Sequence, residues 1–352
     1  MTLLTKGSNI IKKLSGSSYL LEIDKLTEEY DNLIIILDNN HQIDALYNEL
    51  KSLFKEKNIL KFPDYGLEPY DLSQIDKTII RDRYECFIKL NAIDTKKIII
   101  ATYKSVFYRV PLINDVSKSW KKITKQSNYN ELTDMLRSFG YQKTSKVEES
   151  GQYRISGSII DFFSIISNKP IRINFFEDKI ETIKEFDPIS QISSNELDEI
   201  IICTNAIYNV QKSNIDIYLE NIKDFFDDEY KQDIEYERIV HDRNNSYIHN
   251  LIPILFDHTD SLLSSFNDDF ACFLQKDLIS EFNEQYDNLN EAYLQENMKR
   301  YILDPESLLV EKETLEKIFK DNYFYQISDY ADASVKTHSE YNSIPNLSIN
   351  YN

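Results

Sequence analysis

Apolar runs and amphipathic segments alternate along the first third of the chain. Residues 33–37 and 98–101 are continuous apolar runs, and residues 59–62 are apolar except for Lys61, which is typical of buried strands. Between them, residues 43–54 and 78–91 place apolar side chains at the spacing of a helix face. Strands that are apolar throughout and alternate with helices predict a parallel sheet covered on both faces, and therefore an α/β domain.

Later segments are predicted to add a strand and helices to this domain, whereas the two ends of the chain lack its pattern of strands and helices. Residues 270–274 are predicted to be a further strand and residues 278–297 a long amphipathic helix. Residues 219–230 are predicted to be an acidic helix, and residues 1–14 a basic lead that ends in a helix. Residues 329–352 hold few large apolar side chains and are predicted to be a linker.

The middle of the chain contains a series of short apolar segments rather than long helix patterns. Four short segments there are separated by turn residues and are predicted to be strands, and the third of them alternates cleanly between apolar and polar residues. These segments are residues 153–156, 158–163, 171–176 and 180–186. A helix is predicted before them at residues 129–139, with Asn128 as its cap. The segment is therefore expected to form a small sheet-plus-helix domain.

The third of these strands has one ordinary face and one unusual face. The ordinary, apolar face carries Ile171, Ile173 and Phe175. The other face carries Arg172, Asn174 and Phe176. An arginine beside an aromatic ring is typical of the centre of a protein interface. The ordinary alternative, in which Phe176 packs in a second core and Arg172 is a solvated charge, is favoured by the pattern alone.

A dense motif runs through the same strands. Its residues are Gly151, Tyr153, Gly157, Ile160, Asp161, Phe163, Arg172, Ile173, Phe175, Phe176, Asp178, Ile180, Glu181, Ile183, Phe186 and Asp187. With these residues the segment resembles the UvrB-interaction domain, which UvrB and the bacterial transcription-repair coupling factors share. In that family the domain binds UvrA, so the resemblance implies UvrA as the partner of this chain.

The resemblance also implies which residues make the contact. Arg172 and Phe176 match two contact positions of the family. The third, an arginine directly before Gly157, is Ser156 here, and Arg154 on the same strand face is the predicted substitute. The candidate partner-binding residues are therefore Arg172, Phe176, Arg154, Ser156 and Asn174.

A second motif separates the two families. Residues 62–71 read FPDYGLEPYD and precede a helix that contains Ile80 and Arg83. This pattern resembles the transcription-repair coupling factors, whereas UvrB differs here. The resemblance implies the N-terminal, UvrB-like module of such a factor, which recruits UvrA in transcription-coupled nucleotide excision repair.

The domain organisation follows from the same resemblance. Residues 1–115 and 206–328 are expected to form one degenerate helicase-like parallel α/β domain, with residues 116–205 inserted as the UvrB-interaction domain. Residues 329–352 would lead toward a downstream domain that is absent here, so the chain is expected to be a fragment or a split product. In the family, downstream domains bind RNA polymerase and duplex DNA, and a distal domain masks the UvrA site in the resting protein.

Nucleotide chemistry is not expected of this chain. A phosphate-binding loop needs glycines and a lysine, whereas Ser15, Gly16, Ser17 and Ser18, which occupy the place of that loop, include no lysine. UvrB keeps the loop intact, and the coupling factors have lost it. The chain is therefore predicted to be catalytically inactive and to bind no cofactor. The alternative is a UvrB-type ATP-dependent DNA-repair helicase subunit.

Composition narrows the choice of partners. With 59 acidic and 40 basic residues the net charge is −19, which opposes binding of the whole chain to duplex DNA. A local basic cluster, either a solvated hinge or a contact with nucleic acid or an acidic neighbour, consists of Lys118, Lys121, Lys122 and Lys125. The histidines and cysteines show no metal-binding spacing, so no metal is predicted. Widely spaced cysteines and the lack of a long apolar run favour a cytoplasmic protein without membrane contact.

Overall fold

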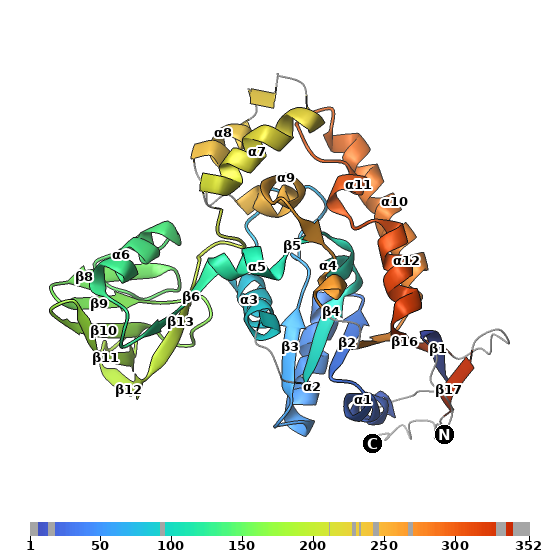
Figure 1. Cartoon of the computed structure of the whole chain (residues 1–352), viewed down its shortest axis with the longest axis horizontal. Helices are drawn as coiled ribbons and strands as arrows, with labels where there is room; N and C mark the ends of the chain where they lie inside the picture. The colour runs from blue at the N-terminus through green and yellow to red at the C-terminus, as the bar shows by residue number, and fades with distance from the viewer. Residues whose placement is uncertain are drawn as a thin grey trace, which may run out of the picture.

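Two sheets dominate the chain, and the smaller one stands apart from the larger one (Figure 1). The computed structural model describes residues 6–12, 18–91, 96–210, 212–226, 230–231, 234–241, 246–266, 270–328 and 336–340. A seven-stranded sheet has the order β17-β1-β16-β15-β2-β4-β3, and a six-stranded sheet has the order β12-β11-β10-β9-β8-β7. The chain leaves the large sheet after β4, builds the small sheet, and returns at β15.

The large sheet is parallel throughout its hydrogen-bonded pairs. Its strands are β1 (Gly7–Lys12), β2 (Asn32–Leu37), β3 (Asn58–Phe62), β4 (Lys97–Thr102), β15 (Phe270–Leu274), β16 (Tyr323–Ser328) and β17 (Lys336–Glu340). All residues of β4 and β15 are buried, because helices cover both faces of a parallel sheet. The α/β class predicted from the sequence is confirmed.

Each face of the large sheet has its own helices. On one face α1 (Ser18–Glu29) and α2 (Asn40–Leu53) bury Ile23, Leu46 and Leu50 against the strands. On the other face, α3 (Lys77–Asn91), α10 (Leu278–Glu296) and α12 (Lys312–Asp321) form the larger core. Residues that alternate along β2 and β4 divide between the two cores, as the period of a strand requires.

Short elements connect the strands and cap the large domain (Figure 1). They are α4 (Tyr103–Phe107), β5 (Val110–Pro111), α5 (Ile113–Val116), a 3-10 turn at Ser117–Ser119, α7 (Lys212–Phe225), α8 (Ile234–His241), a 3-10 turn at Ser246–Asn250, α9 (Ile252–Leu255), β14 (Thr259–Asp260), a 3-10 turn at Leu262–Ser265 and α11 (Pro305–Leu308). The acidic helix expected at 219–230 thus begins earlier, at Lys212, and ends at Phe225.

The small sheet is antiparallel except for its first pair. Its strands are β7 (Gln142–Lys143), β8 (Gln152–Ser156), β9 (Ile159–Phe162), β10 (Ile171–Phe176), β11 (Lys179–Phe186) and β12 (Ser193–Leu197). Helix α6 (Tyr129–Ser138) and a two-stranded ladder of β6 (Trp120–Thr124) and β13 (Glu199–Cys203) pack on one face. This core includes Leu136 of α6, Ile173 of β10 and Ile202 of β13, each fully buried.

Two predictions about the chain ends were wrong. Within residues 1–14, predicted to end in a helix, Gly7–Lys12 form strand β1, which pairs with β16 on one side and β17 on the other. Within residues 329–352, predicted to be a linker, Lys336–Glu340 form the polar strand β17 at the edge of the sheet. Both strands depend on backbone hydrogen bonds to partners distant in sequence, which no local pattern reveals.

Candidate functional site

The side of the small sheet opposite α6 carries the residues singled out from the sequence. We define the polar face as Arg154 and Ser156 of β8, Asp161 of β9, and Arg172, Asn174 and Phe176 of β10. Cross-strand register sets Arg154 and Arg172 on either side of Asp161, and Asn174 one repeat further along. The structure therefore brings all five candidate residues onto one face, while Ile171, Ile173 and Phe175 are buried on the other, as predicted.

The guanidinium of Arg172 is engaged within the chain. Its Nε donates to Oδ1 of Asp161 at 2.8 Å and its Nη2 to Oδ2 at 3.0 Å, so the pair is bidentate. The Asp161 side chain is 3% exposed. The hydrogen bond to Asp161 raises the pKa of Arg172. The guanidinium also lies 4.6 Å from the centre of the Phe186 ring. The Arg172 guanidinium therefore already has a carboxylate partner within the chain.

Arg154 differs from Arg172 in this respect. It is half-buried, and it forms neither a hydrogen bond nor an ion pair with any described residue. Asp161 lies opposite Arg154 on the neighbouring strand, but it forms its ion pair with Arg172. The next cation in the row, Lys184 of β11, has Glu196 of β12 at 3.9 Å. Of the three cations that lie side by side across these strands, Arg154, Arg172 and Lys184, Arg154 is the one without a carboxylate partner among the described residues.

The remaining candidates of the polar face differ in exposure. Phe176 is 70% exposed at the end of β10, so it belongs to no second core. Ser156 is exposed at the end of β8. Asn174 donates from Nδ2 to Oγ1 of Thr182 at 2.8 Å, which fixes its amide on the sheet. An exposed aromatic ring on a hydrogen-bonded strand is what an interface anchor requires.

Sequence analysis missed the loop that follows β11. Arg172 Nη1 donates to the backbone oxygen of Gln191 at 3.0 Å and to Oγ of Ser193 at 3.4 Å, so the loop is tied to the polar face. Ile189 and Ile192 of this loop are 85% and 69% exposed. The two isoleucines in an otherwise polar turn are the feature of the sequence that could have pointed to this loop. The role of Asp161 was also missed, although a carboxylate in an otherwise apolar strand calls for a partner.

The basic cluster near the domain junction is paired internally. Lys118 lies 2.7 Å from Asp115, Lys122 lies 2.7 Å from Glu199, and Lys125 lies 3.5 Å from Glu196. Lys121 pairs with Glu131 of α6. Each lysine therefore has a carboxylate neighbour, which favours the solvated hinge over a contact with phosphate groups.

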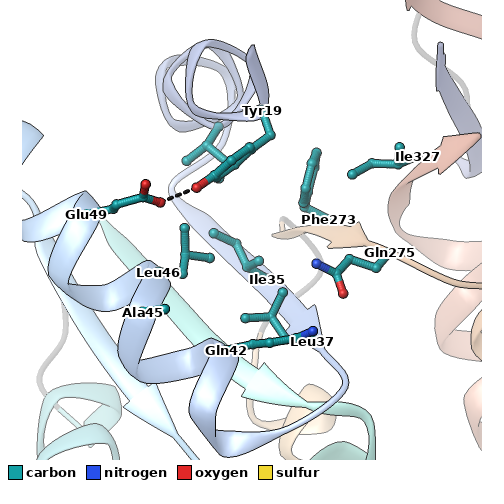
Figure 2. Close-up of a pocket in the computed structure, with 11 residues that line it drawn as sticks. Tyr19, Ile35, Leu37, Gln42, Ala45, Leu46, Glu49, Phe273, Gln275 and Ile327 are labelled. Carbon is teal, nitrogen blue, oxygen red and sulfur yellow. Dashed lines mark hydrogen bonds between the residues drawn. The ribbon is translucent and has the colours of Figure 1, made fainter. Parts of the chain in front are cut away.

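A largely apolar cavity lies beside α1, the helix that follows the expected nucleotide loop. Ser15, Gly16 and Ser17 lie outside the described residues, and of Ser18 only its place at the start of α1 is described. At the carboxyl ends of β2 and β15 lies a cavity of about 250 Å³ (Figure 2). Its lining residues are Tyr19, Ile23, Ile35, Leu37, Gln42, Ala45, Leu46, Glu49, Phe273, Gln275 and Ile327.

The chemistry of this cavity does not suit a polyphosphate. The hydroxyl of Tyr19 donates to the carboxylate of Glu49 across the cavity (Figure 2). Neither lysine nor arginine is among its described lining residues. Among these described residues a phosphate would meet apolar side chains, a tyrosine, two glutamines and one carboxylate rather than a cation.

The cysteines, the possible metal ligands and the helices of the described chain bear on thiol, metal and membrane chemistry. Cys86, Cys203 and Cys272 are free and buried. Burial raises the pKa of Cys86 to about 12 and also raises the pKa values of Cys203 and Cys272. Among the described residues, no group of His, Cys, Asp and Glu could hold a metal ion. None of the described helices combines the length and apolar character that a bilayer crossing requires.

Comparison with known proteins identifies the small sheet. Residues 122–208 match the sequence profile of the UvrB interaction domain. This match includes every residue of the polar face, and it confirms the domain recognised from the sequence motif.

Most of the chain is similar to transcription-repair-coupling factors. That of Rickettsia bellii is 25% identical over 274 residues, which are 77% of this chain and 24% of that protein. That of Rickettsia typhi is 27% identical over 277 residues, with the same coverage of 77% and 24%. That of Escherichia coli is 23% identical over 230 residues, 64% of this chain and 20% of that protein. The chain thus spans about a quarter of the length of the curated relatives it matches.

Proposed function

We propose that this chain is the UvrA-recruiting module of a transcription-repair coupling factor and that it acts in transcription-coupled nucleotide excision repair. The observation that carries the proposal is the polar face in the segment that matches the UvrB interaction domain, where Phe176 is exposed and Arg154 has no partner among the described residues. The names of the relatives favour a coupling factor over a UvrB-type helicase subunit.

The chemistry of its side chains supports docking of UvrA on the polar face. Phe176 supplies an apolar anchor, and the guanidinium of Arg154 can form a bidentate bond with a partner carboxylate. Ser156 and Asn174 lie one repeat from these residues and supply hydroxyl and amide groups. Arg172 contributes through Asp161 and the loop after β11 rather than through a free guanidinium.

The domain borders of the proposed module follow the cores. The third hydrophobic core draws its buried residues from positions 123 to 202, which supports an inserted domain near residues 116–205. The insert also touches the large domain. Lys77 Nζ donates to the Ser150 backbone oxygen at 2.9 Å, and Arg81 Nη2 donates to Oδ1 of Asn168 at 2.7 Å.

Catalysis is assigned elsewhere in this proposal. The described lining of the cavity beside α1 includes no cation for a nucleotide, which supports a chain that would hydrolyse no ATP. The translocase activity and the contacts with RNA polymerase and duplex DNA would belong to downstream domains of the full-length factor. A distal domain of that factor would mask the polar face in the resting protein.

Titration of UvrA against variants of this chain tests the proposal. Phe176→Ala should weaken binding by about tenfold or more, because a central aromatic anchor is lost. It should leave the melting temperature unchanged, because the ring is 70% exposed. Leu294→Ala, a matched control on α10 with 61% exposure, should bind normally. Equal affinities of the Phe176 variant and the unmodified chain would remove Phe176 from the interface.

A further inference from the structure

The loop between β11 and β12 exposes apolar side chains although it is firmly built. Ile189 is 85% exposed and Ile192 is 69% exposed. Single exposed apolar residues are ordinary on protein surfaces. Here two isoleucines lie within one six-residue turn, beside the polar face that also exposes Phe176. Such a group of exposed apolar side chains is typical of a surface that binds a partner.

Hydrogen bonds within the loop fix its conformation. Oδ1 of Asp187 accepts from the backbone nitrogens of Ile189 and Ser190 at 3.1 and 2.7 Å. The backbone nitrogen of Gln191 donates to the Asp187 oxygen at 2.8 Å, and that of Asp187 donates to the Ile192 oxygen at 3.0 Å. The amide of Gln191 also donates to the Pro188 oxygen at 2.7 Å. A loop ordered before binding loses little conformational entropy when it docks.

Arg172 connects this loop to the polar face. One side of its guanidinium holds Asp161, and Nη1 donates to the Gln191 oxygen at 3.0 Å and to Oγ of Ser193 at 3.4 Å. Gln191 has a φ of 60°, a left-handed conformation that is unfavourable for a side chain with a Cβ, so it needs such support. Removal of the guanidinium would therefore release both the loop and the buried carboxylate.

We propose that residues 187–193 form the apolar arm of the UvrA docking surface, and that Arg172 is a positioning residue that holds this arm against the polar face. The inference rests on the proposed function and names the part of the site that supplies its apolar contact. The partner surface that fits is an apolar depression with a carboxylate at its rim. The depression would receive Ile189 and Ile192, and the carboxylate would pair with Arg154.

Charge and dimensions support this occupant. Arg154 has no ion pair among the described residues, and Arg172 neutralises Asp161, so Arg154 leaves a positive charge on the polar face. Along β10, Phe176 lies four residues from Arg172, which is about 13 Å at the rise of a strand. The loop, Arg154 and Phe176 therefore fit within one interface of ordinary size, about 800 Å² on each partner.

The first test removes the apolar arm. The Ile189→Ser/Ile192→Ser double variant should lose about tenfold or more of its affinity for purified UvrA, as expected when exposed apolar anchors are removed. Its melting temperature should stay unchanged, because neither side chain is buried. Met298→Ser, at 87% exposure just after α10, is the matched control and should bind normally. Equal affinity of the double variant and the unmodified chain would overturn the proposal.

The second test separates positioning from direct contact. Arg172→Met should weaken UvrA binding and also speed amide hydrogen exchange at residues 189–192 in the free chain, while Arg172→Lys should restore only part of each. Weaker binding with unchanged exchange in the loop would make Arg172 a direct contact and overturn its positioning role. Light scattering that shows a dimer lost in the isoleucine variant would instead assign the loop to contact between copies of this chain.

The outcomes for the loop and for the proposed function differ. If Phe176→Ala loses UvrA binding while the isoleucine double variant keeps it, the loop proposal fails and the proposed function stands. If the unmodified chain binds no UvrA, both fail. If both variants lose affinity and the control does not, both are supported.

Discussion

At the scale of single residues, Arg83 of α3 is a buried cation surrounded by neutral groups. Its Nη1 donates to the Pro63 oxygen at 2.8 Å, and its Nη2 lies 3.3 and 3.4 Å from the hydroxyls of Tyr65 and Tyr208. The guanidinium also stacks 4.0 Å from the centre of the Phe62 ring. No carboxylate of the described chain forms an ion pair with it. Arg83 thus links α3 to the segment that returns from the small domain.

Substitutions of Arg83 should show that the shape of the guanidinium, rather than its charge, is needed there. Arg83→Lys should destabilise the fold by about 2–4 kcal/mol, because an ammonium is harder to desolvate and cannot stack or bond as a planar group. Arg83→Met should cost less, because it buries no charge. Urea unfolding of both variants measures the difference, and a lysine variant as stable as the methionine variant would contradict the argument.

At the scale of elements, local pattern predicts strands well where it also marks their ends. Residues 171–176 were predicted as a strand and form β10 (Ile171–Phe176), because alternation and the flanking turns agree. The start of α6 was likewise predicted, and the Asn128 side chain accepts from the Glu131 nitrogen at 2.8 Å. β1 was missed, because its partners β16 and β17 lie at the other end of the chain.

The candidate site was only partly predictable for a similar reason. Alternation along β10 is enough to place Arg172, Asn174 and Phe176 on one face. The engagement of Arg172 depends on Asp161 of β9 and on Gln191 in a loop beyond β11, so it follows from strand register and loop conformation. The sequence of β10 alone therefore does not reveal that Arg172 binds Asp161 and Gln191.

The cap of α6 gives a test at this scale. Asn128→Ala removes the acceptor for the Glu131 nitrogen, and loss of such a cap typically costs about 1 kcal/mol of stability. Because α6 lies on the opposite side of the sheet from the polar face, affinity for UvrA should not change. Thermal unfolding and UvrA titration of the same variant measure the two effects. A large loss of affinity would mean that α6 itself contributes to the interface.

At the scale of the whole molecule, the proposal assigns partner binding to the small domain and no nucleotide binding to the large one. The large domain has a parallel sheet with helices on both faces, and the cavity at the carboxyl ends of β2 and β15 is mainly apolar. The small domain carries the polar face. An overall charge of −19 also makes a protein partner a better match for this chain than duplex DNA.

Calorimetry with ATP and magnesium tests this division. We expect no measurable binding at micromolar concentrations of nucleotide, because the described lining of the cavity presents the Glu49 carboxylate and no cation. UvrB, in which the phosphate-binding loop is intact, provides the positive control. Micromolar affinity of this chain for ATP would instead favour an enzyme related to UvrB.

The burial of the three cysteines has a practical consequence for spectroscopy. Thiol-directed dyes react with the thiolate, and burial both hides these sulfur atoms and keeps them protonated at neutral pH. The native chain should therefore need no cysteine removal before labelling. A single dye attached through Lys179→Cys, on the exposed hairpin next to Phe176, would then report the arrival of a partner as a change in fluorescence.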